Sequence, residues 1–280
     1  MNKKINSSYE TAANVFTAFD IAQPLKMFLP DESLISVWEE FMTQYPIEWF
    51  SLVRDSRHTY GYLAFDDEAF QSWPIKGLAR EEASHVEPEI VVPASLPLLE
   101  LIPLFQESYF FFLLSRNEIT HYVSFSDLDK LPFKFCLFGL FMELESQLVE
   151  LLSIDNSKTK QYLSLLTKER LKKAEDLCTQ KYKKETPYHL LLCTTFVDKK
   201  EMFMKSLDFK KDELPFESKN KTNRFFRKIE DVRNQIAHSD SILQKLRTPS
   251  ELNVFINDLS NLTNTIANMK GKALEEYGLL

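Results

Sequence analysis

Residues 49–67 read WFSLVRDSRHTYGYLAFDD, and residues 109–127 read YFFFLLSRNEITHYVSFSD. Each stretch holds two runs rich in aromatic and aliphatic residues, joined by a short polar turn; the runs are Trp49–Val53 with Tyr60–Phe65, and Tyr109–Leu114 with Ile119–Phe125. Such a pattern predicts a β-hairpin in each stretch. Because the two stretches lie about sixty residues apart, the sequence also predicts an internal duplication.

A helix and a short strand are expected before the hairpins. Apolar residues at helical spacing run from Leu34 to Met42 after Asp31-Glu32-Ser33, a capping sequence. Before the second hairpin, Ile90–Val92 suits a strand and Leu96–Phe105 a helix. Both halves therefore predict the order β-α-β-β. The expected boundaries are a tail at 1–17 and a pair of units at 18–131, with the units at about 18–72 and 86–131.

The last strand of each half carries a recognisable ending. The first ending is Gly61-Tyr62-Leu63-Ala64-Phe65-Asp66-Asp67, and the second is His121-Tyr122-Val123-Ser124-Phe125-Ser126-Asp127. Both resemble the G-h-x-[TS]-x-x-D ending of CBS (cystathionine β-synthase) motifs, which occur in tandem. The first departs from the pattern at Ala64 and the second at His121. The resemblance implies a cleft that holds an adenosine nucleotide through Asp67, Ser124 and Asp127. The alternative is that the two aspartates N-cap the helices that follow them.

From Pro132 onward the sequence predicts only helices. Five are expected: Phe133–Val149, Asn156 to about Lys184, Pro187 to about Lys205, Lys219 to about Ser239, and Pro249 to about Tyr277. Residues 132–280 should thus form an all-α helical bundle. The predicted fold class of the whole chain is α+β.

The fourth of these helices ends with Arg233-Asn234-Gln235-Ile236-Ala237-His238. A helical projection puts Asn234 and His238 on the face opposite its apolar residues, with Arg233 at the flank. In a helical bundle this segment resembles the R-x4-6-H signature of HEPN domains, metal-independent endoribonucleases in which two copies form one site across a dimer interface. Arg80 to His85 and Arg116 to His121 repeat the spacing, but neither lies on a predicted helix of the bundle.

The HEPN resemblance implies a role for each side chain. His238 would act as general base or acid on the ribose 2′-hydroxyl or the leaving oxygen, Arg233 would neutralise charge on the phosphate, and Asn234 would orient the scissile group. The product would be a 2′,3′-cyclic phosphate. Glu143 and Glu145 lie inside the apolar run of the first helix, where a carboxylate needs a partner. In related bundles an acidic residue of the first helix often faces the Arg/His motif, so the resemblance implies that Glu145 orients Arg233 or His238. The alternative is that Glu145 and Glu143 are exposed.

Composition narrows the classes of function. The chain has 280 residues and a net charge of −7, yet residues 156–230 hold 19 Lys and Arg against 11 Asp and Glu. That basic segment is either a solvated face or a surface for a phosphate backbone. Five glycines and no glycine-rich loop exclude phosphate-loop enzymes. Three scattered cysteines indicate a reducing, cytoplasmic location, and neither a signal peptide, a membrane span nor a metal site is expected.

Together these features predict a regulated ribonuclease. A CBS-like pair would sense an adenosine nucleotide or dimerise, and a homodimeric HEPN-like bundle would cut RNA without a required cofactor. Its cellular role would be that of a toxin or phage-defence effector, by family resemblance alone. The alternative is a catalytically inactive scaffold for nucleotide sensing and dimerisation.

Overall fold

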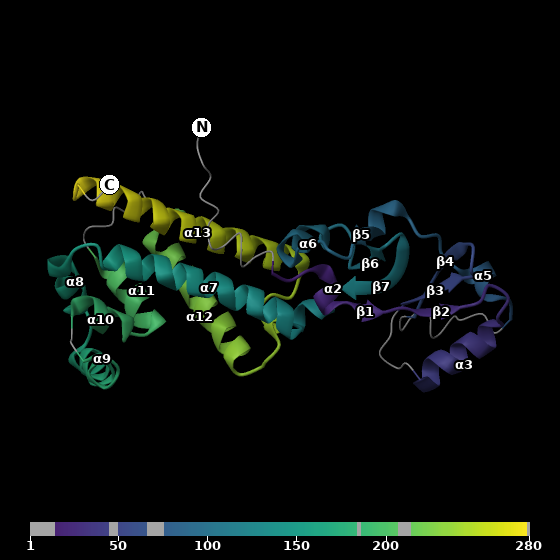
Figure 1. Ribbon diagram of the computed structural model, residues 1–280, viewed down its shortest axis with the longest axis horizontal. Coiled ribbons are helices and arrows are strands. Elements are labelled where there is room, and N and C mark those ends of the chain that lie inside the picture. Colours follow the sequence, from purple (N-terminus) through teal and green to yellow (C-terminus); the bar gives the residue numbers. More distant parts are fainter. Residues whose placement is uncertain (1–14, 45–49, 66–75, 184–185, 207–213, 279–280) are drawn as a thin grey trace. The chain divides into compact units, whose positions relative to one another are not determined.

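The computed structural model describes residues 15–44, 50–65, 76–183, 186–206 and 214–278 (Figure 1). The protein is α+β, as predicted. The chain divides into two compact units, Asn14–Phe133 (the first unit) and Lys134–Leu280 (the second unit).

The first unit contains two copies of the order β-α-β-β. The first copy is β2 (Lys26–Phe28), α3 (Leu34–Gln44), β3 (Phe50–Arg54) and β4 (Thr59–Ala64). The second is β5 (Val91–Pro93), α6 (Leu98–Leu104), β6 (Phe110–Ser115) and β7 (Glu118–Ser124). In both copies the leading strand is parallel to the middle strand, which is antiparallel to the last. The duplication expected from the hairpin spacing is therefore present in the fold.

The two hairpins also share their register. Phe50 lies opposite Ala64, and Phe110 lies opposite Ser124, sixty positions later in both strands. Both hairpins shift register at the turn end. In the second hairpin Arg116 and Asn117 have φ of 50° and 66°, the conformation of a two-residue hairpin turn.

Each copy lends a short segment to the sheet of the other. β1 (Gln23–Pro24) precedes β2 but pairs with β7, so that Gln23 lies opposite Tyr122. Ser84 precedes β5 but bridges Tyr62 of β4, with N–H···O distances of 2.9 Å in both directions. Tyr62 and Tyr122 are equivalent in the repeat. The exchange therefore links the two sheets reciprocally.

The core between the two sheets is built from equivalent residues. Leu52 of β3 and Phe112 of β6 are fully buried and pack in one cluster with Leu25 and Tyr122. Phe50 stacks on Phe110, the residue sixty positions later, with ring centroids 4.1 Å apart. Burial of each large apolar side chain contributes roughly 1.5–3 kcal/mol, so this cluster stabilises the pairing of the two copies.

The described part of the second unit contains seven α-helices where five were predicted. They are α7 (Leu131–Leu152), α8 (Asn156–Leu163), α9 (Lys168–Lys181), α10 (Pro187–Leu192), α11 (Phe196–Lys205), α12 (Lys219–Ala237) and α13 (Pro249–Glu276). The predicted helices over 156–184 and 187–205 are wrong as single helices, because each is interrupted. The Thr167 hydroxyl accepts a hydrogen bond from the Arg170 N–H and starts α9. Thr195 and Asp198 form a capping box that starts α11.

The long helices α7 and α13 run side by side in Figure 1, with the Phe141 and Phe255 rings 6.2 Å apart. The apolar face predicted for α12 is confirmed, since Phe225, Ile229 and Val232 are buried. Because this face packs inward, the opposite side of α12, with Asn234, is exposed to solvent.

Candidate functional site

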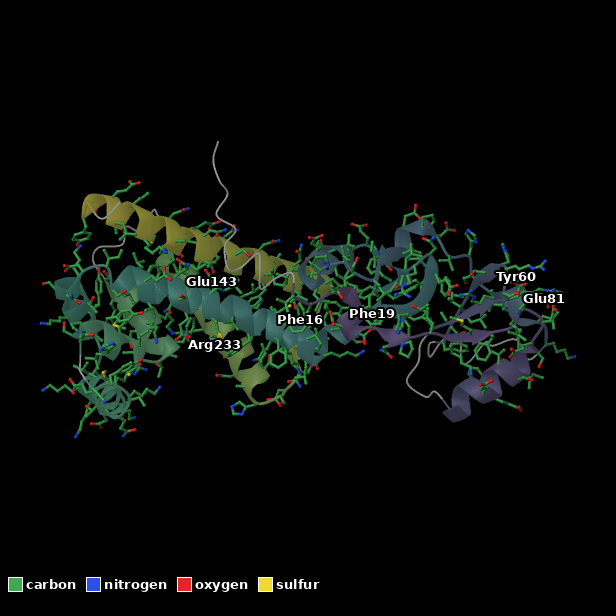
Figure 2. All side chains as sticks on the ribbon, in the orientation of Figure 1. Phe16, Phe19, Tyr60, Glu81, Glu143 and Arg233 are labelled. Carbon is green, nitrogen blue, oxygen red and sulfur yellow. The ribbon has the colours of Figure 1, made fainter. Side chains whose placement is uncertain are left out.

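Arg233 lies near the end of α12 (Figure 2) and is held from two sides. Its Nη2 lies 3.1 Å from Oε2 of Glu145 on α7. The guanidinium also lies over the Phe196 ring of α11, 4.5 Å from the centroid. The Arg233 side chain is 21% exposed, so it keeps access to solvent while its orientation is fixed.

Glu145 binds a second cation. Its Oε1 lies 3.0 Å from Nζ of Lys199, whose side chain is only 3% exposed. That ammonium also donates to the Thr194 carbonyl at 2.5 Å. A buried ammonium is stable only when it is paired and hydrogen-bonded, so Lys199 needs Glu145. We call Lys199, Glu145 and Arg233 the Glu145 network; it joins α11, α7 and α12.

Arg233 does not pair with Glu230, which lies three residues before it on the same helix. Glu230 instead binds Lys200 of α11 at 2.5 Å. Glu143 accepts from the Gln147 amide at 2.9 Å on its own helix. Of the two candidate glutamates, the structure therefore brings Glu145 to Arg233.

His238 lies just beyond the helix rather than inside it. α12 ends at Ala237, close to the expected end at about Ser239, and Ser239 itself adopts a φ of 59°. The N–H of Asp240 then donates to the Gln235 carbonyl at 2.8 Å, which closes the helix in a Schellman motif. The buried Lys134 donates to the Asp240 carbonyl at 2.9 Å and pins this turn.

The side chains of Asn234 and His238 are both exposed. They are four residues apart and lie on one side, whereas Arg233 and His238 differ by about 140° around the helix axis. Within the described part of the chain, the His238 side chain has no hydrogen-bond or ion-pair partner. The structure therefore joins Arg233 to Glu145 and leaves His238 and Asn234 directed to solvent.

The candidate nucleotide ligands of the first unit form a helix cap. Asp127, 3% exposed, accepts from the N–H and hydroxyl of Ser124 at 2.7 and 2.8 Å. It also accepts from the Gln23 amide at 2.8 Å and pairs with Lys130 at 3.0 Å. The expectation that Asp127 is an N-cap is wrong, because Ser124 is the N-cap of the short helix η2 (Phe125–Asp129) and Asp127 its third residue. Asp67 lies outside the described residues.

The other two R-x4-H matches lie in different surroundings. Arg80 on α5 (Ala79–Glu82) pairs with Asp31 at 2.6 Å, and His85 is exposed in a loop. His121 is in β7 against the Phe19 ring, and its burial lowers the pKa of the imidazole. Neither match has a counterpart of the Glu145 network among the described residues.

Cys136, Cys178 and Cys193 are buried free thiols. Over the described ranges, no group of His, Cys, Asp and Glu side chains is placed to hold a metal ion. None of the described helices has both the length and the apolar character needed to cross a membrane. Comparisons with models of known families, with curated proteins and with solved structures find no match to this chain.

Proposed function

We propose that the second unit is a metal-independent endoribonuclease of HEPN type. The observation that carries the proposal is the Glu145 network, which fixes Arg233 on α12, the helix that also carries the exposed Asn234 and ends at the exposed His238. A guanidinium has five donors, and Glu145 engages Nη2. The remaining donors suit the oxygens of a phosphate.

In the proposed reaction one His238 imidazole accepts the proton of the ribose 2′-hydroxyl. The 2′-oxygen attacks the phosphorus, and the bond from phosphorus to the 5′-oxygen breaks. A second, protonated imidazole gives its proton to the leaving 5′-oxygen. Arg233 stabilises the charge on the phosphate, and Asn234 orients it. The products are a 2′,3′-cyclic phosphate and a 5′-hydroxyl.

The proposal requires two copies of the chain, and the surface of α7 supports a homodimer. Phe138 and Met142 are 36% and 57% exposed and are four residues apart on one side of α7. Glu145 follows one turn later on the same side. A second copy that covers these residues thereby comes close to Arg233. Replacing Met142 with Glu should shift the protein to monomer in sedimentation and abolish cleavage; an active monomer contradicts the shared site.

RNA as substrate is supported by the charge distribution. Residues 156–230 have a net charge of +8, whereas the rest of the chain has −15. A local excess of cations attracts a phosphate backbone even when the whole protein is acidic.

The test is cleavage of single-stranded RNA with EDTA present. Arg233→Ala and His238→Ala should each lower the rate by at least about a hundredfold, the usual contribution of a positioned acid, base or charge. His85→Ala, which removes an exposed histidine from a motif of the same spacing, is the matched control and should leave the rate unchanged. Equal rates for parent and His238→Ala, with both proteins folded, refute the proposal.

For the first unit we propose a CBS-like module that dimerises or senses an adenosine nucleotide and regulates the nuclease. The reciprocal exchange of segments between its copies supports a stable paired module. Asp127 already has four polar contacts, which favours dimerisation over a ribose contact at that carboxylate. A parent protein that never cleaves RNA, but melts at a higher temperature with adenosine nucleotides, would instead identify the inactive scaffold. A role as toxin or phage-defence effector follows only from the family resemblance.

A further inference from the structure

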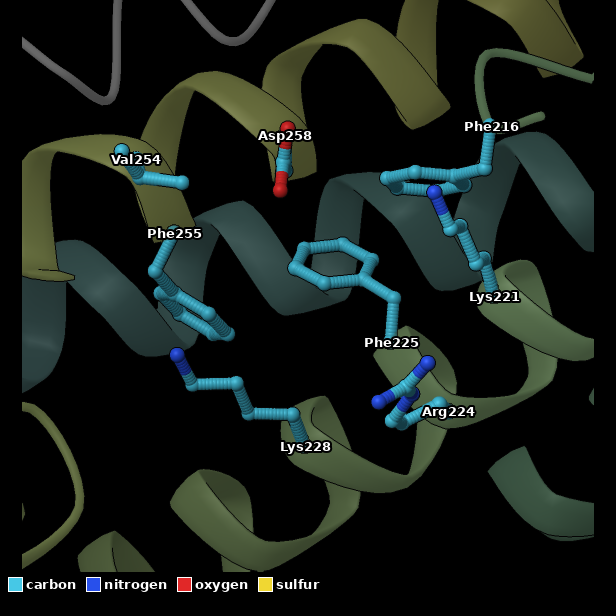
Figure 3. A pocket seen from close by; sticks show the side chains of 8 residues that line it. All are labelled: Phe216, Lys221, Arg224, Phe225, Lys228, Val254, Phe255 and Asp258. Carbon is cyan, nitrogen blue, oxygen red and sulfur yellow. The ribbon is translucent and has the colours of Figure 1, made fainter.

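A cavity of about 270 Å³ lies between α12 and α13 of the second unit, away from the Glu145 network (Figure 3). Three phenylalanine rings form its apolar side. The Phe216 and Phe225 centroids are 5.1 Å apart, and those of Phe225 and Phe255 are 5.5 Å apart. Phe225 and Phe255 belong to the core, whereas Phe216 is half-buried. Phe225 and Phe255 are only 8% and 1% exposed, so Phe216, which packs on Phe225, offers most of the aromatic surface to a planar ligand.

Three cations from α12 border the aromatic side. Lys221 is paired with Glu217, and Lys228 lies over the Phe255 ring at 5.4 Å. Arg224 is exposed and has no ion-pair partner within the described part of the chain. Its guanidinium is therefore the cation available to an incoming anion.

A single carboxylate, Asp258 of α13, is directed into the space above Phe225 in Figure 3. Asp258 is half-buried and makes no hydrogen bond or close ion pair with the described residues. Burial raises the pKa of Asp258, while the charge of Lys228 lowers it. A ligand for this cavity must therefore bring hydrogen-bond donors to Asp258 and an anion to Arg224. An acidic peptide meets the second requirement only, because its carboxylates repel Asp258.

We propose that this cavity binds a guanosine phosphate, with the base against the phenylalanine rings, its N1–H and N2 amino group donating to Asp258, and the phosphate on Arg224. Two parallel donors match the two oxygens of a carboxylate. Adenine and cytosine offer one amino group on that edge, and uracil offers one imino group. Aromatic side chains commonly stack on bases in this way.

The guanosine phosphate can be a free nucleotide or one residue of a single-stranded RNA. Arg224 is fourteen residues before His238, or about 21 Å along the helix. The site therefore goes beyond the proposed nuclease, and binding to it does not need His238.

Binding is measured by titration calorimetry with the full-length His238→Ala protein, so that RNA is not cleaved during the titration. GMP should bind at least about tenfold more tightly than AMP, CMP or UMP, since a base without the paired donors leaves a carboxylate oxygen unsatisfied. Inorganic phosphate should bind more weakly than any of them. A hexaadenylate with one guanosine is the RNA arm: tighter binding than GMP identifies RNA as the source, and binding no tighter than GMP identifies the free nucleotide.

Two variants and one control test the contacts. Arg224→Ala should weaken GMP binding by about tenfold, as expected for a charge-assisted contact. Asp258→Asn should bring GMP and AMP to within about twofold of each other, because an amide offers only one acceptor. Arg227→Ala removes an exposed arginine of the same helix that does not line the cavity, and it should change nothing. Melting temperatures confirm that each variant is folded.

Equal affinity for the four mononucleotides, or equal effects of Arg224→Ala and Arg227→Ala, overturns the proposal. Different results would refute the nuclease proposal and the guanosine-site proposal. Absence of RNA cleavage by the parent protein removes the nuclease and leaves this site, whereas cleavage without guanosine selectivity in binding removes this site alone.

Discussion

Replacing Glu145 with Gln tests whether the Glu145 network holds the second unit together. The substitution keeps the shape of the side chain and removes its charge. Lys199, 3% exposed, then has no anionic partner among the described residues and keeps only neutral acceptors, the Thr194 carbonyl and the amide oxygen of the new side chain. Arg233 loses its ion pair but retains the Phe196 ring.

The expected loss of stability follows from the burial of the two cations. Removing the partner of a buried charge costs about 3–5 kcal/mol, and the 25% exposure of Glu145 places the Lys199 contribution at the low end. The Arg233 contribution is about 0.5 kcal/mol, because both partners are partly exposed. Glu145→Gln should therefore lower the free energy of unfolding by about 3 kcal/mol. With a urea m-value of about 1–3 kcal/mol per molar, the midpoint falls by about 1–3 M.

Urea unfolding of a double-mutant cycle with Lys199→Met measures the coupling. The double variant has no unpaired buried charge and should be at least about 1.5 kcal/mol more stable than Glu145→Gln alone. Glu150→Gln, on the same helix and 48% exposed in its pair with Lys270, is the matched control and should cost less than about 1 kcal/mol. The reasoning is refuted if the single losses simply add, or if Glu145→Gln costs no more than Glu150→Gln.

Three further predictions concern the first unit. Gly61→Ala should cost on the order of 1–3 kcal/mol in urea unfolding, because its Cβ would lie 2.3 Å from the Ser84 carbonyl oxygen; an unchanged midpoint contradicts the close approach. Asp127→Ala should cost on the order of 2 kcal/mol through the lost cap and buried hydrogen bonds, and a melting temperature equal to the parent's excludes a structural role. Because burial lowers the pKa of His121, the unfolded chain binds more protons, so stability should fall as the pH drops below about 6.5. His121→Gln should flatten this dependence, and identical pH profiles of the two proteins would argue against it.

The duplication could be predicted because the residues that define a hairpin are close together in the sequence. Alternating runs and a polar turn identify each hairpin, and the sixty-residue interval relates them. The exchange of segments could not be predicted in this way. Gln23-Pro24 is two residues long and Ser84 makes one bridge, so neither carries a pattern, and their partners are distant in the sequence.

The breaks in the predicted helices did have a signal. Thr195 and Asp198 have the spacing of a capping box, and Thr167 can cap the helix that follows it. The helical spacing of apolar residues continues past Thr167 and Thr195, and for that reason it predicts one helix on each side of residue 186 where the structure has two. Local hydrogen bonding to a threonine hydroxyl decides where the helix restarts.

A carboxylate within an apolar helix needs a partner, which predicts a role for Glu143 and Glu145 alike, and the resemblance to HEPN bundles favoured Glu145. Lys199 could not be predicted, since it is one of 34 lysines and arginines and its neighbours in sequence do not distinguish it. Its burial results from the packing of α11 against α12 and from the position of Glu145 on α7. Lys199, the buried cation of the candidate site, can therefore be identified only from the folded structure.

The geometry of α12 bears directly on how the proposed nuclease could work. The Glu145 network holds Arg233 toward α7 and α11, whereas His238 follows the helix end and is directed to solvent about 140° away. His238 therefore points away from a phosphate that is bound to Arg233 of the same chain. A second chain can supply the imidazole, and the exposed Phe138 and Met142 give it a surface to bind. In the proposed arrangement dimerisation would complete the catalytic site, and a rigid Arg233 would help because the other half of the site arrives with the partner.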